Sequence, residues 1–299
     1  MRYGDDDRES QNVEDQRSSG GFGGGRGMRI PIQIGGPGGM SLTSLLVVGA
    51  ICLMLGINPL DLLSGGGSIP VGGQGSSGPQ QPLSPQDEAN GRFVKRVLTD
   101  TEDVWNKTFQ DSGRKYQEPK LVLFRGGIPT ACGTGDARMG PFYCPVDQKV
   151  YIDLVFFDEL KRRFNAPGEF AQAYVVAHEV GHHVQTLLGV SERVRDAQQR
   201  DPRRANEMQV RMELQADCLA GVWANRTNQM KQRLEPGDIE SGLRAASAIG
   251  DDTLQKQTQG RVVPESFTHG SSAQRVRWFS KGLETGQMQA CDTFGAGAL

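Results

Sequence analysis

The chain has 299 residues, with 33 Lys and Arg against 35 Asp and Glu and a formal net charge of −2. This balance lacks the basic excess of nucleic-acid-binding surfaces, so we expect no nucleic-acid partner. Half of the 40 glycines lie in the first 80 residues. The remaining residues, about 220 of ordinary composition, are enough to bury a hydrophobic core in one domain.

Residues 1–39 are rich in glycine and polar side chains, and the few apolar residues among them, such as Phe22 and Ile30, are isolated. A segment of this kind buries too little apolar surface to offset the entropy of ordering. We therefore expect a disordered, Gly-rich leader over residues 1–39.

Residues 40–57 follow as a run of eighteen without a charged side chain. A helix of that length covers about 27 Å, close to the ~30 Å of a bilayer core, so we expect a transmembrane anchor over residues 40–60. A buried core helix would need partners that the low-complexity flanks lack, and a cleaved signal peptide would need a shorter leader. Arg26 and Arg29 precede the run and the next basic residue is Arg92. The positive-inside rule then predicts a single-pass inner-membrane protein with a cytoplasmic N-terminus and a periplasmic domain.

Residues 61–86 are rich in Gly, Ser, Pro and Gln and predict a flexible linker to a domain over residues 87–299. Four cysteines lie in this domain, an even number that suits pairing in an oxidising compartment. Cys132 with Cys144 would close a short Gly- and Pro-rich loop and leave Cys218 with Cys291. The alternative is four reduced, buried thiols.

The domain is expected to begin with a helix and two strands. Apolar residues recur at helical spacing over residues 86–110, and short apolar runs at residues 121–124 and 150–157 predict strands. Four further helices are expected over residues 169–188, 203–230, 238–257 and 272–283. Strands followed by a run of helices predict an α+β fold, mostly helical with a small sheet.

The segment His178-Glu179-Val180-Gly181-His182-His183 carries the strongest chemical signal. His178 and His182 are i and i+4 on a helix, so both imidazoles project from one face and can bind the same metal ion. Glu179 points about 100° away, where in such sites it reaches the attacking water. His183 faces away from the metal side and is expected to pack or to form hydrogen bonds. Gly181 is expected to let the next ligand-bearing helix approach closely.

A third ligand has to come from elsewhere, because Gln185 and Leu188 occupy the positions where an extended HExxHxxGxxH motif has Gly and His. Glu213 on the next long helix can complete a His₂Glu set. Asp217, one turn later, can accept the free ring N–H of a ligand histidine. The alternative for this acidic pair is a solvated helix face paired with Arg211.

The segments HEVGHH and ELQADCLAG resemble zincin peptidases with a glutamate third ligand. The chain is most similar to the bacterial family of predicted neutral zinc metallopeptidases, and the likeness includes the leader and residues 268–272. The motif pair also resembles membrane-bound CAAX-type and heat-shock zinc endopeptidases, from which this chain departs in having one predicted span. The resemblance implies a zincin-like domain, a Zn²⁺ ion and a peptide or protein substrate.

A catalytic scheme follows from these residues. Glu179 is expected to act as general base, and His269, ahead of the last long helix, is a candidate for stabilising the oxyanion or else a surface or capping residue. Arg275 is a weaker companion that could equally be a surface charge. The strand at residues 150–154 could pair with the substrate backbone.

A catalytically inactive zincin-fold scaffold or binding module of the cell envelope is the alternative function. A pure binding protein would not need Glu179, which favours the peptidase. Zinc is the expected ion because it commonly occupies His₂Glu sites.

Overall fold

The computed structural model describes residues 1–18, 83–136, 140–162, 166, 168–295, 297 and 299. All of them belong to one compact unit formed by Met1–Gly21 and Gln81–Leu299. Its strands are β1 (Val13–Asp15), β2 (Lys120–Phe124), β3 (Gly127–Thr130), β4 (Gly133–Asp136), β5 (Phe142–Cys144) and β6 (Lys149–Asp153). Its α-helices are α3 (Pro85–Asp111), α4 (Val155–Arg162), α5 (Glu169–Leu187), α6 (Val190–Arg200), α7 (Ala205–Lys231), α8 (Asp238–Ala248), α9 (Asp251–Gln259) and α10 (Ser272–Thr285). Short 3₁₀ turns are η2 (Pro202–Arg204), η3 (Pro264–Ser266) and η4 (Met288–Cys291).

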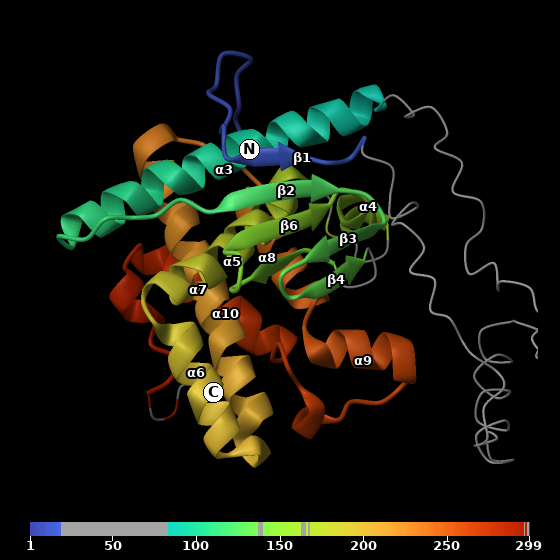
Figure 1. The fold of residues 1–299 in the computed structure, drawn as a ribbon, viewed down its shortest axis with the longest axis vertical. Coiled ribbons are helices and arrows are strands. Elements are labelled where there is room, and N and C mark those ends of the chain that lie inside the picture. Colours follow the sequence, from blue (N-terminus) through green and yellow to red (C-terminus); the bar gives the residue numbers. More distant parts are fainter. Residues whose placement is uncertain (19–82, 137–139, 163–165, 167, 296, 298) are drawn as a thin grey trace, which may run out of the picture. The chain divides into compact units, whose positions relative to one another are not determined.

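The main sheet has four strands in the order β1-β2-β6-β5 (Figure 1). Strands β1, β2 and β6 run parallel, and β5 pairs antiparallel with β6. Successive side chains of a strand point to opposite faces. Leu121 and Val150 therefore face the main hydrophobic core, whereas Val122 and Tyr151 face a smaller cluster that includes Ile128 of the β3–β4 hairpin.

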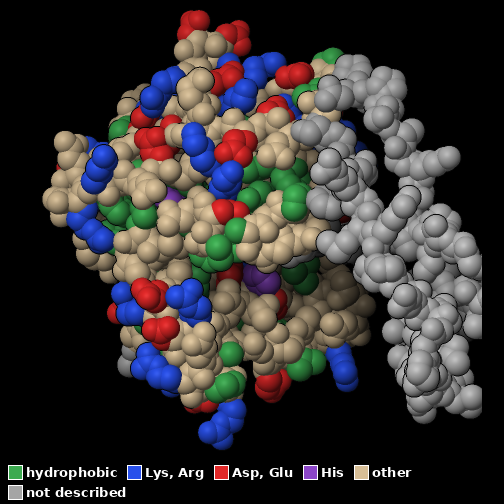
Figure 2. All heavy atoms as spheres, in the orientation of Figure 1, with side chains coloured by type: hydrophobic (Ala, Val, Ile, Leu, Met, Phe, Trp, Pro, Cys, Tyr) green, Lys and Arg blue, Asp and Glu red, His purple; other side chains and the backbone are tan. Residues whose placement is uncertain are grey.

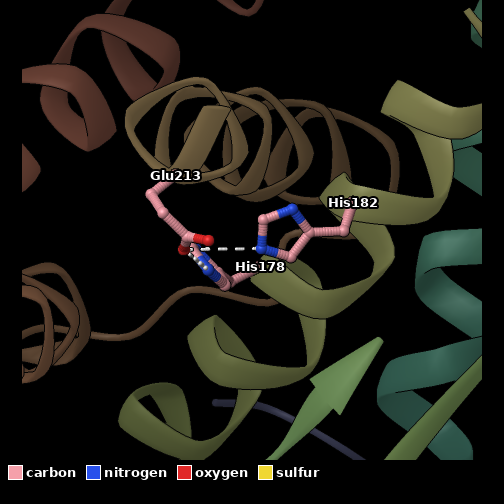
Figure 3. A group of neighbouring side chains, drawn as sticks. All are labelled: His178, His182 and Glu213. Carbon is pink, nitrogen blue, oxygen red and sulfur yellow. Dashed lines mark hydrogen bonds and ion pairs between the residues drawn. The ribbon is translucent and has the colours of Figure 1, made fainter. Parts of the chain in front are cut away.

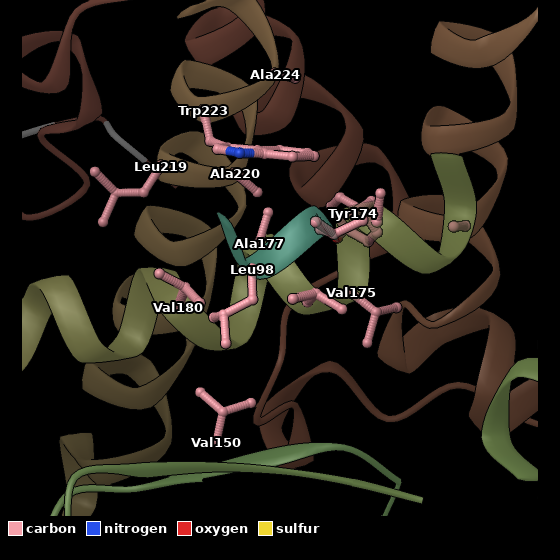
Figure 4. Close-up of a cluster of buried hydrophobic side chains, with 14 of the residues drawn as sticks. Leu98, Val150, Tyr174, Val175, Ala177, Val180, Leu219, Ala220, Trp223 and Ala224 are labelled. Carbon is pink, nitrogen blue, oxygen red and sulfur yellow. The ribbon is translucent and has the colours of Figure 1, made fainter. Parts of the chain in front are cut away.

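The main core lies between the sheet and the helices α3, α5 and α7. Val150 of β6 points toward α5, and Leu98 of α3 and Trp223 of α7 approach from other directions (Figure 4). Nearly every residue of α5 between Phe170 and Gln185 is buried, and these include Glu179 and the three histidines. The chemical motif therefore lies on the most deeply buried helix.

Close contacts between helices depend on glycine at several positions, and two of these show how near α5 and α10 lie to α7. A Cβ atom on Gly181 of α5 would lie 3.1 Å from the Ala216 carbonyl oxygen of α7. A Cβ atom on Gly282 of α10 would lie 1.9 Å from the Cys218 carbonyl oxygen of α7. The expected role of Gly181 in bringing the next helix close to α5 is confirmed.

Most predicted helices are present within one to three residues of their expected bounds. Ser84 and Asp87 form a capping box at the start of α3, and Ser271 and Gln274 form one at the start of α10. The helix expected over residues 238–257 is divided near Gly250 into α8 and α9. A Cβ atom on Gly250 would lie 2.4 Å from the Ser272 backbone nitrogen, so only glycine fits at this division without a shift of the backbone.

The strand expected over residues 150–157 ends earlier than predicted. The Asp153 carboxylate accepts a hydrogen bond from the Val155 backbone N–H at 3.0 Å, and the chain turns there into α4. Helix α6, strand β5 and the β3–β4 hairpin were not predicted, because their apolar residues are too few for a periodic pattern.

The expectation of a disordered leader is wrong for its first part. Residues 1–18 belong to the compact unit, and β1 pairs with β2 in register from Val13 with Leu121 to Asp15 with Leu123. Charged side chains complete the attachment: Arg233 pairs with Asp7 at 2.6 Å, and Lys149 pairs with Glu14 at 2.8 Å. Each of these partners lies over 100 positions away in the chain, so a local composition argument could not find it. Residues 19–39 lie outside the described residues.

The expected transmembrane element of the fold is also corrected. Among the described residues, no helix combines the length and the apolar character that crossing a membrane requires. The predicted span at residues 40–60 and nearly all of the linker at residues 61–86 lie outside the described part.

The two disulfides are those expected from the cysteine spacing. Cys132 is bonded to Cys144, which joins the β3–β4 hairpin to β5, and Cys218 is bonded to Cys291, which joins α7 to η4. The prediction of these pairs is confirmed, and the alternative of four reduced thiols is not.

Candidate metal centre

Two histidines from one helix and a glutamate from another lie together in the buried interior. His178 and His182 lie one turn apart on α5, and Glu213 reaches them from α7 (Figure 3). The Glu213 Oε2 atom lies 3.2 Å from His178 Nε2 and 3.5 Å from His182 Nε2. One ligand atom from each residue lies within 4.8 Å of the other two, so these residues form a group that could hold a metal ion.

The outer nitrogen of each imidazole has its own acceptor. His178 Nδ1 lies 2.9 Å from Asp217 Oδ1, and His182 Nδ1 lies 2.8 Å from Gln185 Oε1. Each acceptor favours a proton on Nδ1 and leaves the Nε2 lone pair directed at the shared position beside Glu213. The expected role of Asp217 is consistent with this contact, whereas the role of Gln185 was missed. The sequence analysis used Gln185 only to exclude a longer motif.

Gln185 is held in a definite orientation. Its amide nitrogen donates to the Met212 carbonyl at 2.7 Å and to Gln215 Oε1 at 3.1 Å, both on α7. The amide oxygen is therefore the atom that faces His182. On the other side of the site, Gln209 donates to Glu213 Oε1 at 2.8 Å, which leaves Oε2 toward the histidines.

Asp217 is the centre of a second buried group. The Arg275 guanidinium from α10 donates to both carboxylate oxygens at 2.9 Å, and the Tyr174 hydroxyl donates to Oδ1 at 2.5 Å. Asp217 and Arg275 are 0% and 2% exposed. Arg275 is therefore an internal partner of Asp217, and the expectation that it could be a surface charge is wrong.

The electrostatics of the site favour a cation. Burial alone would raise the pKa of Asp217, but Arg275 and His178 outweigh it and lower that pKa to about 2. Burial would likewise raise the pKa of Glu213, yet His182 and His178 hold it well below its usual value. Burial would lower the pKa of His178, but Asp217 and Glu213 raise it to about 10. Two ionised carboxylates thus attract positive charge to the histidine nitrogens, and a His₂Glu donor set fits zinc.

The metal group borders an open cleft with a volume of about 840 Å³. Figure 2 shows histidine atoms inside a hollow on this face, with hydrophobic side chains near its edge. The cleft is lined by Gly140, Pro141, Phe142, Tyr143, Pro145, Phe156, Glu159, Tyr174, Val175, His178, Glu179, His182, Ser191, Gln209, Met212, Glu213, Ile249, Leu254, Thr258, His269 and Arg275. The structure therefore brings Glu179 and the three metal-group residues to a space that a substrate can enter.

His269 lies in the wall of the same cleft, and its side chain is 50% exposed. The Asp251 Oδ2 atom accepts hydrogen bonds from three consecutive backbone N–H groups, those of residues 268–270, at 2.6–3.0 Å. Asp251 Oδ1 also lies 3.3 Å from His269 Nδ1. This arrangement holds the backbone of His269 in place at the cleft while its ring stays accessible.

His183 is hydrogen-bonded and faces away from the metal group, as expected. Its Nε2 lies 2.6 Å from the Gln117 carbonyl oxygen, and its Nδ1 lies 3.1 Å from the Tyr143 hydroxyl. Burial lowers the pKa of His183, which favours the neutral ring.

The expected substrate-pairing strand is wrong. Strand β6, which contains residues 150–153, lies between β2 and β5, so both of its edges are already paired. In the described part of the sheet, the strand with a free edge beside the cleft is β5.

Comparison with known proteins identifies the family to which the chain belongs. The model of the family described as "Putative neutral zinc metallopeptidase" matches residues 1–294. The chain belongs to this family. "Uncharacterized protein YpfJ" of Escherichia coli (strain K12) is 49% identical over 291 residues, which cover 96% of this chain and 97% of that relative. "Uncharacterized protein Rv2575" of Mycobacterium tuberculosis is 41% identical over 272 residues, or 83% and 86% of the two chains. No solved structure matches the chain.

Proposed function

We propose that this chain is a zinc-dependent peptidase that hydrolyses peptide bonds in the cleft beside α5. The observation that carries the proposal is the buried His178, His182 and Glu213 group, whose ligand atoms converge at the floor of an accessible cleft. Family membership supports the same activity. A peptide or protein is the substrate that such an activity implies.

In this proposal His178, His182 and Glu213 hold the ion. A zinc ion bound there supplies Lewis acidity, which lowers the pKa of water toward ~7 and polarises a carbonyl group. Asp217 and Gln185 keep the two imidazoles oriented through their Nδ1 atoms. None of these five residues transfers a proton to the substrate.

Glu179 acts as the general base. Its carboxylate lines the cleft next to His178, takes a proton from the attacking water and passes it to the leaving amine. His269 lies in the cleft wall and donates a hydrogen bond to the oxyanion that develops on the substrate carbonyl. The free edge of β5 offers backbone groups that pair with an extended peptide.

The two disulfides support a site of action in an oxidising compartment outside the cytoplasm. Thiol-blocking mass spectrometry on protein extracted from cells tests this point. If the thiol reagent modified Cys132, Cys144, Cys218 and Cys291 before any reducing agent was added, the result would contradict this point.

The metal content of the full chain tests the function, compared with Glu213→Ala and Glu179→Gln. We expect about one zinc ion per chain in the wild type and in Glu179→Gln, and loss of zinc in Glu213→Ala. A peptide library should be cleaved by the wild type and not by Glu179→Gln. Zinc-loaded wild type that cleaves no peptide would favour an inactive binding module.

A further inference from the structure

The third histidine of the HEVGHH segment has no place in the metal group, yet it is among the most buried polar residues. His183 is 0% exposed and lies between two tyrosines, with ring centroids 5.8 Å away at Tyr116 and 5.5 Å away at Tyr143. A carbonyl oxygen only accepts hydrogen bonds, so His183 Nε2 carries the proton that it shares with Gln117. Nδ1 is then the acceptor for the Tyr143 hydroxyl, which lies 3.1 Å away.

Tyr143 is the residue through which β5 contacts α5. The neighbours of Tyr143 in this three-residue strand, Phe142 and Cys144, pack on the opposite face of the sheet, in the cluster around Tyr151. Tyr143 instead packs against the main core, and its hydroxyl also interacts with Thr186, one turn beyond His183 on α5. The contacts of the Tyr143 hydroxyl with His183 and Thr186 therefore join the edge strand to the helix that carries the metal group.

We propose that His183 is a substrate-positioning residue: through Tyr143 it fixes the edge strand β5 at a set distance from His182, so that β5 receives the backbone of an extended peptide. The proposal rests on the proposed peptidase function. His182 and His183 are adjacent on one rigid helix, so the position of β5 relative to the metal group depends on this contact. Cys144 is bonded to Cys132, which restrains the far end of the same strand.

A peptide long enough to pair along β5 should depend on this contact, whereas a short substrate should not. A net hydrogen bond contributes about 0.5–1.5 kcal/mol, which corresponds to a roughly two- to tenfold change in binding. Because pairing with β5 is equally strong in the ground state and in the transition state, its loss raises KM and leaves kcat unchanged. A residue with a purely structural role would not distinguish substrates by length.

The test compares the zinc-loaded full chain with Tyr143→Phe, which removes the hydroxyl and keeps the ring. We expect KM for an eight-residue peptide to rise several-fold, with zinc content and kcat unchanged. KM for a blocked dipeptide should be unchanged. Hydrogen–deuterium exchange of the β5 amides should be several-fold faster in the variant.

Tyr116→Phe is the matched control. Tyr116 contacts the same imidazole from the other side, and its buried hydroxyl has no hydrogen-bond partner among the described residues. Removal of that hydroxyl should change neither the exchange of β5 nor the dependence on peptide length. If Tyr143→Phe behaves like Tyr116→Phe in both measurements, the proposal is overturned.

A wild-type chain that binds zinc but cleaves no peptide would overturn the proposed peptidase function, but it would not decide whether His183 positions β5. In that case the affinity of the uncleaved eight-residue peptide, measured by fluorescence anisotropy, decides it. Several-fold weaker binding to Tyr143→Phe supports positioning by His183, and equal binding overturns it.

Discussion

The Asp217 group inside the domain and the N-terminal segment on its surface are both held by ion pairs, but in different environments. Asp217 and Arg275 are almost fully inaccessible to solvent, whereas Arg8 and Asp103, which attach the segment, are 65% and 30% exposed. Removing one partner of a buried pair leaves an uncompensated charge in a medium of low polarity. An exposed charge that loses its partner is still solvated by water. Ion pairs of similar length, 2.9 Å for Arg275 with Asp217 and 2.6 Å for Arg8 with Asp103, therefore contribute unequal energies in the two regions.

The largest effect is expected for Arg275→Met, which leaves the Asp217 carboxylate buried without its guanidinium. We expect the free energy of unfolding, measured by urea denaturation, to fall by about 3–5 kcal/mol. Arg277→Met on the exposed side of α10 is the control, with an expected loss below about 1 kcal/mol from its contact with Trp278. Similar losses in both variants would contradict the difference between buried and exposed pairs.

Gly181→Leu should separate α5 from α7 and so disrupt the metal group. Even the first carbon of the new side chain would lie 3.1 Å from the Ala216 carbonyl oxygen, and overpacking of this kind costs about 1–3 kcal/mol. We expect zinc content, measured by inductively coupled plasma mass spectrometry, to fall sharply. Gly181→Ala should cause a smaller loss. Full zinc occupancy in Gly181→Leu would show that the contact does not set the position of Glu213.

Gln185→Met should weaken zinc binding without removing a ligand. The variant keeps a similar side-chain volume but takes away the acceptor of His182 Nδ1. Loss of such an outer contact typically lowers metal affinity about 10- to 100-fold. Competition with a chromophoric chelator measures the affinity, and an unchanged value would exclude an orienting role for Gln185.

The smallest effect is expected for Asp7→Asn in the N-terminal segment. The hydrogen bond from Arg233 lowers the pKa of Asp7, so the ionised form is favoured while the segment is attached. This contribution is complete above the unfolded pKa of about 3.9 and is lost as the pH falls through the lower folded pKa. At pH 7 the substitution should weaken attachment by less than about 1 kcal/mol.

Hydrogen–deuterium exchange of the β1 amides measures this attachment. In the wild type the exchange, corrected for its intrinsic pH dependence, should rise as the pH falls below about 4. In Asp7→Asn part of that rise should disappear. A variant with the same pH dependence as the wild type would show that other carboxylates hold the segment.

The local features of the candidate site were predictable from the sequence. The i, i+4 spacing of His178 and His182 follows from helix geometry, and so does the shared face of Glu213 and Asp217. The caps of α3 and α10 depend on residues three positions apart, and Cys132 and Cys144 lie 12 positions apart, which leaves Cys218 with Cys291 as the remaining pair. The family model that matches residues 1–294 is described as a zinc metallopeptidase, which is the class that these motifs indicated.

Only the tertiary structure showed which charged and polar side chains are internal. The sequence does not reveal whether Arg275 is exposed, and it became an inner partner of Asp217 because α10 packs at backbone contact on α7. Gln185 gained its role from hydrogen bonds to α7 that fix the direction of its amide. Strand β1 and the free edge of β5 depend on pairing between distant segments. Patterns along the chain predict the type and the extent of each helix or strand. Contacts between these elements decide where a charge is buried and which strand edge lies beside the cleft.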